Sequence, residues 1–304
     1  MKVLVIGGGG REHALAWKLS QSERIQKVYV APGNGGTARD PNLVDVPITD
    51  VKALREWAQQ EKIELTVVGP EAPLAAGVVD EFRAHGMRIF GPTKAAAQLE
   101  SSKAFSKAFM HRHGIPTAIY ETFTDAVQAH AYVDKMGAPI VVKADGLALG
   151  KGVLLTHSTP EAEKAVDDML LRGSFGEAGS RIVIQELLEG IEISLHALCD
   201  GKTAKLFPTA QDHKRISDGD LGLNTGGMGA YSPAPFIDDV ALEKVGKAIL
   251  EPWLAGCAAE GIDFRGLLYP GVMLTANGPK VLEFNARKDL KTKCFVIGQI
   301  FGSI

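Results

Sequence analysis

The stretch "IVVKADGLALGKGVLLT" (residues 140–156) has the pattern of an apolar strand, a glycine-rich loop and a second strand. Lys143 lies near the end of the first strand, where burying an unpaired ammonium would cost free energy. An alternating strand that turns Lys143 outward to solvent is the alternative. The loop that follows carries three glycines and a second cation: Gly146, Gly150, Gly152 and Lys151. Such a loop can fold over a triphosphate and exclude water, so the stretch predicts a nucleotide site.

The loop is not of the Walker A type, because Lys151 is followed by glycine rather than by serine or threonine. Downstream, "VIQELLEGIEIS" (183–194) has the pattern of a strand followed by a short hinge. Backbone groups of the hinge can form hydrogen bonds with an adenine edge. Glu186 and Glu192 can accept hydrogen bonds from amino and ribose hydroxyl groups. Either glutamate alone is more often a solvated surface charge. Their position after Lys143 and the glycine loop favours the nucleotide interpretation.

A third element of the same site is "LEFN" (282–285). Glu283 and Asn285 alternate with apolar residues, so both side chains point to one face of a strand. A carboxylate and an amide oxygen form a hard-ligand pair suited to Mg²⁺ bridging ATP phosphates. Arg287 lies on the same face, where it can stabilise a transferring phosphoryl group.

The first hundred residues alternate short apolar strands with helical segments, which predicts an α/β fold with a doubly wound parallel sheet. Ligands of such sheets lie beyond the carboxyl ends of the strands. Four loops are expected there: "GGGGREHA" (7–14), "APGNGGT" (31–37), "VGPEAPL" (68–74) and "FGPT" (90–93). The first loop fails the dinucleotide fingerprint, since Glu12 and His13 stand where glycine is required. It can still present backbone N–H groups to a phosphate; a tight turn without a ligand is the alternative.

The amino-acid composition argues against several classes of function. The 33 basic and 36 acidic residues give a net charge of -3, which implies no bulk attraction to nucleic acid. Three widely spaced cysteines, Cys199, Cys257 and Cys294, form neither a metal pattern nor a disulfide framework. No apolar run is long enough for a membrane span or a signal peptide, so a cytoplasmic protein without a membrane partner is expected.

Several longer motifs carry a resemblance to a known family: "VIGGGGREHALAWKL" (5–19), "IFGPTKAAAQLESSKAF" (89–105), "QDHKR" (211–215) and "LNTGGMGAYSPAP" (223–235). With the strand lysine, the glycine loop and E-x-N-x-R, they resemble the phosphoribosylamine–glycine ligase family of the ATP-grasp superfamily. The resemblance runs from Met1 to about Arg287. It implies an N-terminal substrate-binding domain (1–101), an α+β ATP-grasp domain (102–287) with a mobile lid at about 120–190, and no C-terminal domain.

The resemblance also implies the reaction, which belongs to purine synthesis. ATP phosphorylates the carboxylate of glycine, and the amine of 5-phosphoribosylamine attacks the glycyl phosphate to give glycinamide ribonucleotide, ADP and phosphate. No protein nucleophile is needed, and catalysis would rest on positioning and charge neutralisation. A monomer is expected. A dehydrogenase fits less well because the dinucleotide fingerprint fails, and a different ATP-grasp ligase would differ in its acceptor.

By the same resemblance, each site residue has an implied role. ATP would be held by Lys103, Lys143, Gly146, Gly150, Lys151, Gly152, Glu186, Leu187, Leu188 and Glu192. Phosphoribosylamine would be held by Gly9, Gly10, Arg11, Glu12, His13, Asn34, Gly35, Pro70 and Glu71. The acceptor side would be lined by Asp212, His213, Lys214, Arg215, Asn224, Thr225, Gly226, Gly227 and Met228. Glu283 and Asn285 would bind Mg²⁺ or Mn²⁺, and the catalytic group would comprise Arg287, Lys143, Asp212 and Arg215. His213 is expected to position substrate rather than act as a general base.

The chain departs from the family pattern at a few places. Leu223 stands where the family usually has proline, and Leu149 replaces a customary small residue. After Arg287 the family continues with Phe-Gly-Asp-Pro-Glu, whereas this chain has "KDLKTKCFVIGQIFGSI" (288–304). A frameshift or a truncated gene is the hypothesis, and the DNA sequence would test it. An active ligase and a non-catalytic nucleotide-binding remnant are both open at this point.

Overall fold

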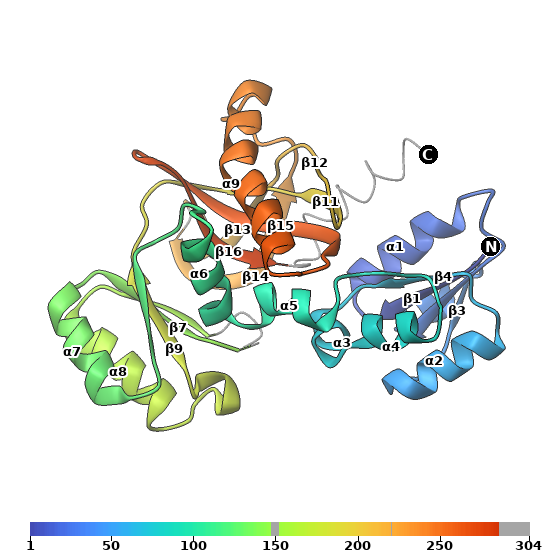
Figure 1. Cartoon of the computed structure of the whole chain (residues 1–304), viewed down its shortest axis with the longest axis horizontal. Coiled ribbons are helices and arrows are strands. Elements are labelled where there is room, and N and C mark those ends of the chain that lie inside the picture. Colours follow the sequence, from blue (N-terminus) through green and yellow to red (C-terminus); the bar gives the residue numbers. More distant parts are fainter. Residues whose placement is uncertain (147–151, 220, 286–304) are drawn as a thin grey trace.

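Five parallel strands form the sheet of the N-terminal third of the chain, in the order β3-β2-β1-β4-β5. The computed structural model describes residues 1–146, 152–219 and 221–285. The strands are β1 (Lys2–Gly7), β2 (Lys27–Pro32), β3 (Leu43–Asp45), β4 (Leu65–Val68) and β5 (Ile89–Phe90). Their apolar β-branched residues are buried, and the sheet has a separate apolar cluster on each face. The predicted doubly wound parallel sheet is therefore confirmed (Figure 1).

Helices cover both faces of this sheet, as parallel strands require. They are α1 (Gly10–Ser20), α2 (Val51–Gln60), α3 (Glu71–Ala76) and α4 (Val78–Ala84), with a 3₁₀ turn η1 (Thr37–Arg39). α3 was not expected, because the sequence "VGPEAPL" reads as a loop. Gly77, at φ 90°, ends α3 and allows the chain to restart as α4.

Two helices replace the single long helix that the sequence predicts up to Gly114. They are α5 (Lys94–Ser101) and α6 (Lys103–Arg112), with Ser102 in an extended conformation between them. The hydroxyl of Ser102 accepts a hydrogen bond from Phe105 N at 3.1 Å and donates one to Asp145 Oδ1 at 3.0 Å. A serine N-cap supported by Asp145, 43 residues along the chain, therefore divides the helix, a tertiary effect that local helix propensity does not report.

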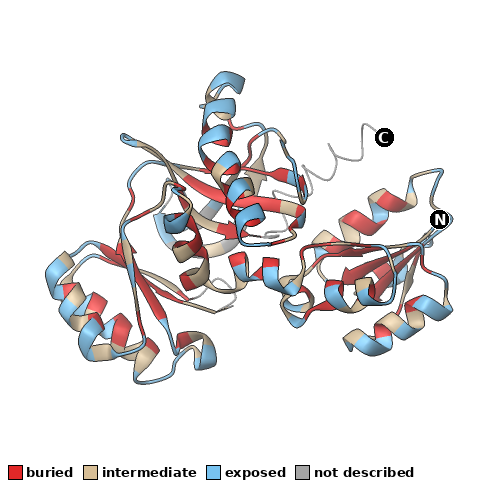
Figure 2. Ribbon diagram, in the orientation of Figure 1, coloured by how far each residue is buried: buried red, intermediate tan, exposed pale blue. Residues whose placement is uncertain are grey.

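A four-stranded antiparallel sheet follows, in the order β6-β9-β7-β8. Its strands are β6 (Tyr120–Phe123), β7 (Ile140–Ala144), β8 (Val153–Thr156) and β9 (Ile182–Glu186). Helices α7 (Ala126–Met136) and α8 (Thr159–Leu170) pack on one face and bury its apolar side chains, and the turn η2 (Gly176–Gly179) precedes β9 (Figure 2). The opposite face of the sheet carries Lys143, which is 6% exposed.

The remaining sheet is built around the long strand β15. β10 and β11 pair with one edge of β15, β16 pairs with its other edge, and β12 adds to β11. The bounds are β10 (Ile191–Ser194), β11 (Ala197–Asp200), β12 (Ala204–Leu206), β15 (Arg265–Thr275) and β16 (Gly278–Asn285). Helix α9 (Asp239–Ala259) covers this sheet with Trp253 and its neighbours in the largest apolar cluster. Where the sequence pattern at 183–194 indicates a strand and a hinge, the structure has β9 and, after the hinge, β10 and β11.

The glycine-rich run at 224–229 lies in a strand rather than in the loop that the sequence suggests. It belongs to β14 (Leu221–Tyr231), which pairs antiparallel with β13 (Gln211–Ser217). Two shifts of register interrupt the ladder of this hairpin. Backbone pairing with β13 therefore organises a segment whose glycines alone indicate a turn. Among the described residues, no helix combines the length and apolar character needed to cross a membrane.

Candidate active site

The strand lysine Lys143 lies in a cluster of ionisable groups drawn from four elements. Lys107 on α6 is 2% exposed, and burial together with the neighbouring Lys143 lowers its pKa well below the ordinary lysine value. Glu283 on β16 and Glu186 on β9 oppose that shift, which places both carboxylates within electrostatic range of the buried ammonium. The prediction that the Lys143 strand is buried is confirmed, because all five residues of β7 are buried.

Lys107 was not predicted from the sequence. A lysine in an amphipathic helix normally suggests a solvated charge, and only its spacing of four residues from Lys103 indicates a shared face. Its Nζ donates to Thr117 Oγ1 at 2.6 Å, and Thr117 Oγ1 donates to Val281 O at 2.6 Å. The chain of contacts therefore links α6 directly to β16, the strand that carries Glu283.

The start of the glycine loop is tied to the beginning of α6. Lys103 Nζ donates to Gly146 O at 3.1 Å, and Asp145 Oδ1 accepts a hydrogen bond from Ala104 N at 2.7 Å. At the other end of the loop, Ala144 N donates to Gly152 O at 2.8 Å. Gly150 and Lys151, which were predicted to cover the phosphates, lie outside the described residues.

The predicted adenine hinge begins at Glu186. Its Oε1 accepts hydrogen bonds from Lys280 Nζ at 2.7 Å and from Ile119 N at 2.9 Å. Burial acts to raise the pKa of Glu186, but these hydrogen bonds outweigh it and hold the pKa below the ordinary value. Leu188 is buried and Leu187 partly so. The side chain of Glu186 thus joins the hinge to β16, and the sequence did not reveal Lys280 as its partner.

Glu283 and Asn285 lie together on β16, as the alternation predicted. Asn285 Nδ2 lies 3.4 Å from both Glu283 Oε1 and Tyr269 O. The amide Oδ1 of Asn285 therefore points away from these two oxygens. Phe284 between them is buried in the apolar core. Within the described ranges, no group of three or more acidic, histidine or cysteine side chains is able to hold a metal. A carboxylate and an amide oxygen fit a hard divalent cation that takes its remaining ligands from phosphates and water. Arg287 lies outside the described residues.

The loops that were predicted to bind substrate meet at the carboxyl ends of β1, β2 and β4. Arg11 donates to Gly69 O at 3.0 Å, and Asn34 Nδ2 donates to Gly8 O at 3.1 Å. A cavity of about 140 Å³ lies between these loops, lined in part by Gly7, Gly8, Pro32 and Pro70. The second loop also packs closely on the first, because a side chain at Gly36 would overlap His13. The other residues predicted to bind substrate in this region are Gly9, Gly10, Gly35 and Glu71.

Glu12 lies in the first turn of α1 and is more deeply buried than its neighbours Arg11 and His13. It is 2% exposed, its Oε2 accepts from Gly9 N at 2.8 Å, and its Oε1 lies 3.3 Å from Arg11 Nε. Side chains at Gly7 or Gly69 would overlap it. Glu12 therefore fills the space between β1 and β4 and positions Arg11 and the loop.

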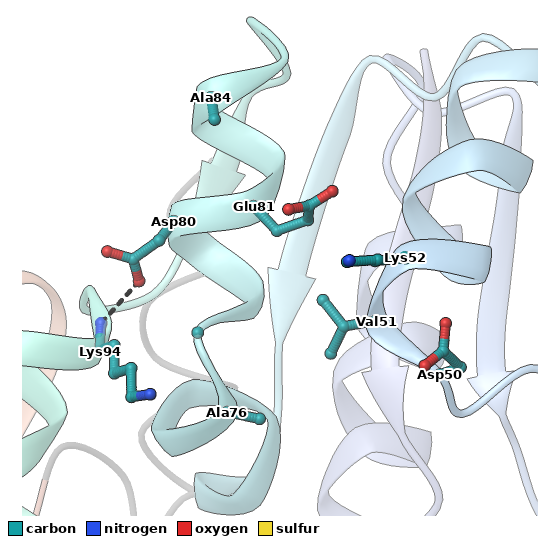
Figure 3. Close-up of a pocket in the computed structure, with 9 residues that line it drawn as sticks. Asp50, Val51, Lys52, Ala76, Asp80, Glu81, Ala84 and Lys94 are labelled. Atoms are coloured by element: carbon teal, nitrogen blue, oxygen red, sulfur yellow. Dashed lines mark hydrogen bonds between the residues drawn. The ribbon is translucent and has the colours of Figure 1, made fainter.

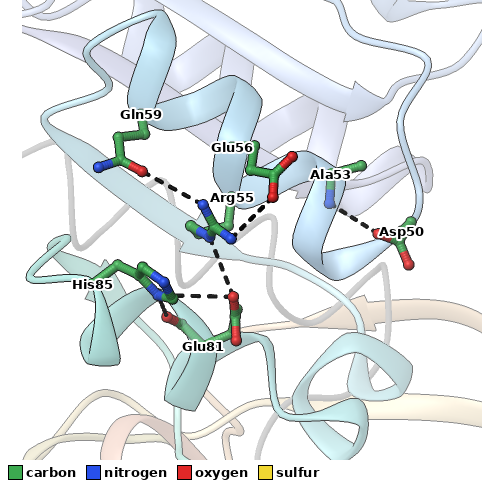
Figure 4. A network of polar contacts seen from close by, with 7 residues as sticks. All are labelled: Asp50, Ala53, Arg55, Glu56, Gln59, Glu81 and His85. Atoms are coloured by element: carbon green, nitrogen blue, oxygen red, sulfur yellow. Dashed lines mark hydrogen bonds and ion pairs between the residues drawn. The ribbon is translucent and has the colours of Figure 1, made fainter.

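A larger hollow of about 670 Å³ lies on the α2 and α4 side of the same sheet (Figure 3). Three carboxylates and two lysines border it: Asp50, Asp80, Glu81, Lys52 and Lys94. Lys94 N donates to Asp80 Oδ2 at 2.7 Å, and Glu81 pairs with Arg55 and His85 (Figure 4). These contacts account for Asp80 and Glu81, and Asp50 accepts a hydrogen bond from Ala53 N at 2.8 Å. The hollow contains none of the residues predicted from the sequence.

The hairpin β13–β14 brings Asp212 against β10. Asp212 Oδ1 lies 3.4 Å from Ser194 Oγ, and Ser194 Oγ lies 2.7 Å from the hydroxyl of Tyr269. The His213 ring lies 5.5 Å from the Tyr231 ring, Thr225 is partly buried and Met228 is exposed. Among the other predicted hairpin residues, Arg215 pairs with Asn224 through the backbone. The side chains of Lys214, Arg215 and Asn224 lie outside the described part of the chain, and so do the surroundings of Gly226 and Gly227.

Residues 1–100 match the N domain of phosphoribosylglycinamide synthetase, and residues 101–292 match its ATP-grasp (A) domain. Phosphoribosylamine–glycine ligase of Ralstonia nicotianae is 60% identical over 288 residues, and that of Escherichia coli O157:H7 is 57% identical over 290. The aligned regions cover 94% of this chain and 68% of each relative.

A solved structure agrees with these matches. The crystal structure of phosphoribosylamine–glycine ligase from Thermotoga maritima superposes with a TM-score of 0.83 at 34% identity, over 98% of this chain and 72% of that one. Biotin carboxylase from Campylobacter jejuni, at 15% identity and a TM-score of 0.74, shares the fold. The predicted ATP-grasp architecture is thereby confirmed, and the chain belongs to the phosphoribosylamine–glycine ligase (phosphoribosylglycinamide synthetase) family.

Proposed function

We propose that the chain joins glycine to 5-phosphoribosylamine in purine biosynthesis, with conversion of ATP to ADP and phosphate. The γ-phosphoryl group passes to a carboxylate oxygen of glycine, and ADP leaves. The amine of phosphoribosylamine then forms a bond to the glycyl carbon, phosphate leaves, and the new amide nitrogen loses a proton. The observation that carries this proposal is the convergence of Lys143, Lys107 and Glu283 from three separate elements.

These residues suit phosphoryl transfer because that chemistry needs charge neutralisation and alignment rather than a protein nucleophile. Lys143 and Lys103 would bind the phosphates of ATP, with loop 145–153 closing over them and excluding water. Backbone groups of 186–188 would hold adenine, and Glu192 would hold the ribose. A side chain of Arg287 would stabilise the transferring phosphoryl group.

Glu283 and Asn285 would hold a divalent cation, Mg²⁺ or Mn²⁺, which would supply charge neutralisation to the ATP phosphates when bound. The hydrogen bond from Lys280 to Glu186 supports this arrangement, since it keeps the hinge next to the metal strand. The chain itself contributes the positions of these ligands through the β15–β16 ladder.

The loops at 9–13, 33–37 and 69–71 would hold phosphoribosylamine, with backbone N–H groups near the phosphate. We place the boundary between the substrate and ATP-grasp domains at residues 101 and 102, with a mobile lid at about 120–190. The family match extends to residue 292, a few residues past the limit at Arg287 that the sequence motifs suggest. We expect the protein to act as a monomer in the cytoplasm.

The test is ADP release by the purified chain, with ATP, Mg²⁺ and each substrate added or omitted. Release that depends on both glycine and phosphoribosylamine supports the proposal. ATP binding without turnover would instead identify the chain as a nucleotide-binding remnant. Turnover with another amine acceptor in place of phosphoribosylamine would identify a different ATP-grasp ligase.

A further inference from the structure

We infer that Arg83 and Asp263 are positioning residues that fix the N-terminal domain against the ATP-grasp domain; the consequence for catalysis rests on the proposed function. In the proposed reaction, glycyl phosphate forms at the ATP-grasp domain, whereas the N-terminal domain holds the attacking amine. The acyl carbon and the amine nitrogen must approach to about 3–3.5 Å, so a small displacement between the domains slows the attack. Water then competes: it attacks the acyl carbon, the bond to phosphate breaks, and glycine, phosphate and a proton are released.

Helix α5 separates the two parts of the proposed site by the width of one helix. It packs against α3, which begins at Glu71 in a loop proposed to hold phosphoribosylamine, and against β16, which carries the proposed metal ligands. Figure 1 shows α5 between the two halves of the molecule. An α-helix with its side chains is about 10 Å across, and its internal hydrogen bonds make it a stiff spacer. The separation of the two substrates therefore depends on how each domain holds α5.

Each domain buries a different part of α5. Ala97 belongs to the apolar cluster of the N-terminal sheet, together with Leu74 of α3. Ala96 and Leu99 belong to the cluster of the β15 sheet, together with Phe284 of β16. The three α5 side chains are at most 3% exposed. The helix is thus packed into both cores, and a turn of one domain against the other would disturb one of them.

A second link between the domains is the ion pair of Arg83 on α4 with Asp263, which lies just before β15. Arg83 Nη1 donates to Asp263 Oδ2 at 3.2 Å, and Arg265 Nε donates to Asp263 Oδ1 at 2.9 Å. Arg265 therefore orients the carboxylate from its own domain and leaves the other oxygen for Arg83. Arg83 Nη2 also donates to Gly91 O at 3.4 Å, directly after β5. One guanidinium thus connects α4, the end of β5 and the ATP-grasp domain.

The backbones of the two domains approach each other next to this ion pair. A Cβ at Gly266 of β15 would lie 3.1 Å from Pro92 Cδ and 3.7 Å from Gly91 Cα, so a larger residue would have to displace this segment by a few tenths of an ångström. Gly91 is also the acceptor for Arg83. The ion pair and the close backbone approach therefore act on the same segment, and α5 begins at Lys94 soon after it.

The experiment measures ADP and glycinamide ribonucleotide in the same reaction mixture. The wild type should release one ADP for each product molecule. In Arg83→Met and Asp263→Asn, product formation should fall about 10-fold and ADP release should fall less, so the ratio of ADP to product should rise. Both partners are partly exposed, so these variants should fold. Arg83→Lys keeps a cation for Asp263 and should remain close to the wild type. Gly266→Ala should raise the ratio by displacing the segment at Pro92.

Arg112→Met is the matched control. It removes a partly exposed ion pair with Glu260, which lies wholly within the ATP-grasp domain. This variant should keep one ADP for each product molecule. An equal rise of the ratio in Arg112→Met and Arg83→Met would assign the effect to a general loss of stability and overturn the inference.

A distance measurement tests the contact between the domains without turnover. Nitroxide labels at Lys52→Cys on α2 and Lys244→Cys on α9 are both at exposed positions, and pulsed electron paramagnetic resonance reports the distance between them. The background variant is Cys294→Ser, because Cys199 and Cys257 are buried. The labelled wild type should give one narrow distribution of distances. Loss of the ion pair between the domains should shift or broaden it, and the control substitution on α6 should not.

The two readouts distinguish failure of the inference from failure of the proposed function. If the wild type turns over, and Arg83→Met keeps both one ADP per product and the wild-type distance distribution, the inference fails and the proposed function stands. If the wild type does not turn over but Arg83→Met changes the distance distribution, the contact between the domains stands and the proposed function fails. An unchanged distance distribution without turnover rejects both.

Discussion

The ammonium of Lys280 on β16 lies 2.7 Å from Glu186 Oε1 at the end of β9, with about a quarter of each side chain exposed. The pair joins β16, which carries the proposed metal ligands Glu283 and Asn285, to the hinge predicted for adenine. Because each partner belongs to a different sheet, the contact restrains the junction where ATP is proposed to bind.

Lys280→Met should weaken this junction. The loss should be about 1 kcal/mol or less at pH 7, because the pair is partly solvated. The pKa of Glu186 is lowered in the folded state, so the pair stabilises the protein above the unfolded glutamate value of 4.5 and loses that effect as pH falls through the folded pKa. Urea unfolding should therefore separate variant and wild type at pH 7 and bring them together near pH 3.

The control for this prediction is Lys247→Met on α9, whose partner Glu243 is exposed four residues earlier. That variant should match the wild type in both stability and ATP binding. An ATP dissociation constant that rises only in Lys280→Met would support the role of the pair at the hinge. Equal behaviour of the two variants would contradict it.

Lys107→Met tests the buried ammonium. The pKa of Lys107 is lowered by burial and by Lys143, so the unfolded chain binds more protons than the folded chain between the lowered value and 10.5. Wild-type stability should consequently gain from rising pH across that range through this residue. Between pH 7 and pH 10 the unfolding free energy of the wild type should therefore increase relative to that of Lys107→Met. A pH-independent difference would show that Lys107 does not titrate in this way.

Thr117→Val tests the link between α6 and β16. The substitution keeps the shape of the side chain but removes the acceptor for Lys107 and the donor to Val281 O. We expect a loss of roughly 2 kcal/mol in unfolding free energy, because two buried polar groups lose a partner. Thr124→Val, at an exposed position, should change stability little. Similar losses in both variants would point to a general intolerance of valine.

Gly69→Ala tests the crowding around Glu12. A Cβ at Gly69 would overlap the buried side chain of Glu12, whereas a Cβ at Gly35 meets nothing within 4 Å. Gly69→Ala should lower the unfolding free energy by roughly 1–3 kcal/mol and raise the KM for phosphoribosylamine, since Arg11 and the loop must shift. Gly35→Ala should leave stability nearly unchanged. Thermal unfolding of the two variants side by side gives the comparison.

Glu283→Gln tests the metal ligands. Replacing the carboxylate by an amide should weaken Mn²⁺ binding measured by electron paramagnetic resonance in the presence of ADP, because a hard cation favours a charged oxygen ligand. Glu243→Gln, on the exposed face of α9, is the matched control. Equal Mn²⁺ affinity in both variants would remove Glu283 from the proposed metal site.

Local pattern was sufficient for much of this architecture. Apolar β-branched runs with glycine at their ends predicted the parallel sheet of the first hundred residues, and the loops at its carboxyl edge. The two-residue alternation around Glu283 and Asn285 predicted a shared face, because strand geometry dictates it. Lys143 could be predicted as buried from the apolar strand around it.

Other features depend on residues far apart in the sequence. Ser102 interrupts the helix because its hydroxyl donates a hydrogen bond to Asp145. The 224–229 run becomes a strand because β13 pairs with β14. In the sequence, Lys107 and Lys280 have the pattern of solvated lysines. Their contacts exist only because the fold brings α6, β9 and β16 together.

The sequence by itself thus determined the order of the strands and helices, the family and the identity of the chemical groups available for phosphoryl transfer. Only the tertiary structure decided which of those groups meet. Asp212 reaches Ser194, and Lys280 reaches Glu186, through strand pairing between distant segments. Periodicity and propensity act over a few neighbouring residues, whereas burial, hydrogen bonding and charge interactions act across whatever surfaces the fold brings into contact.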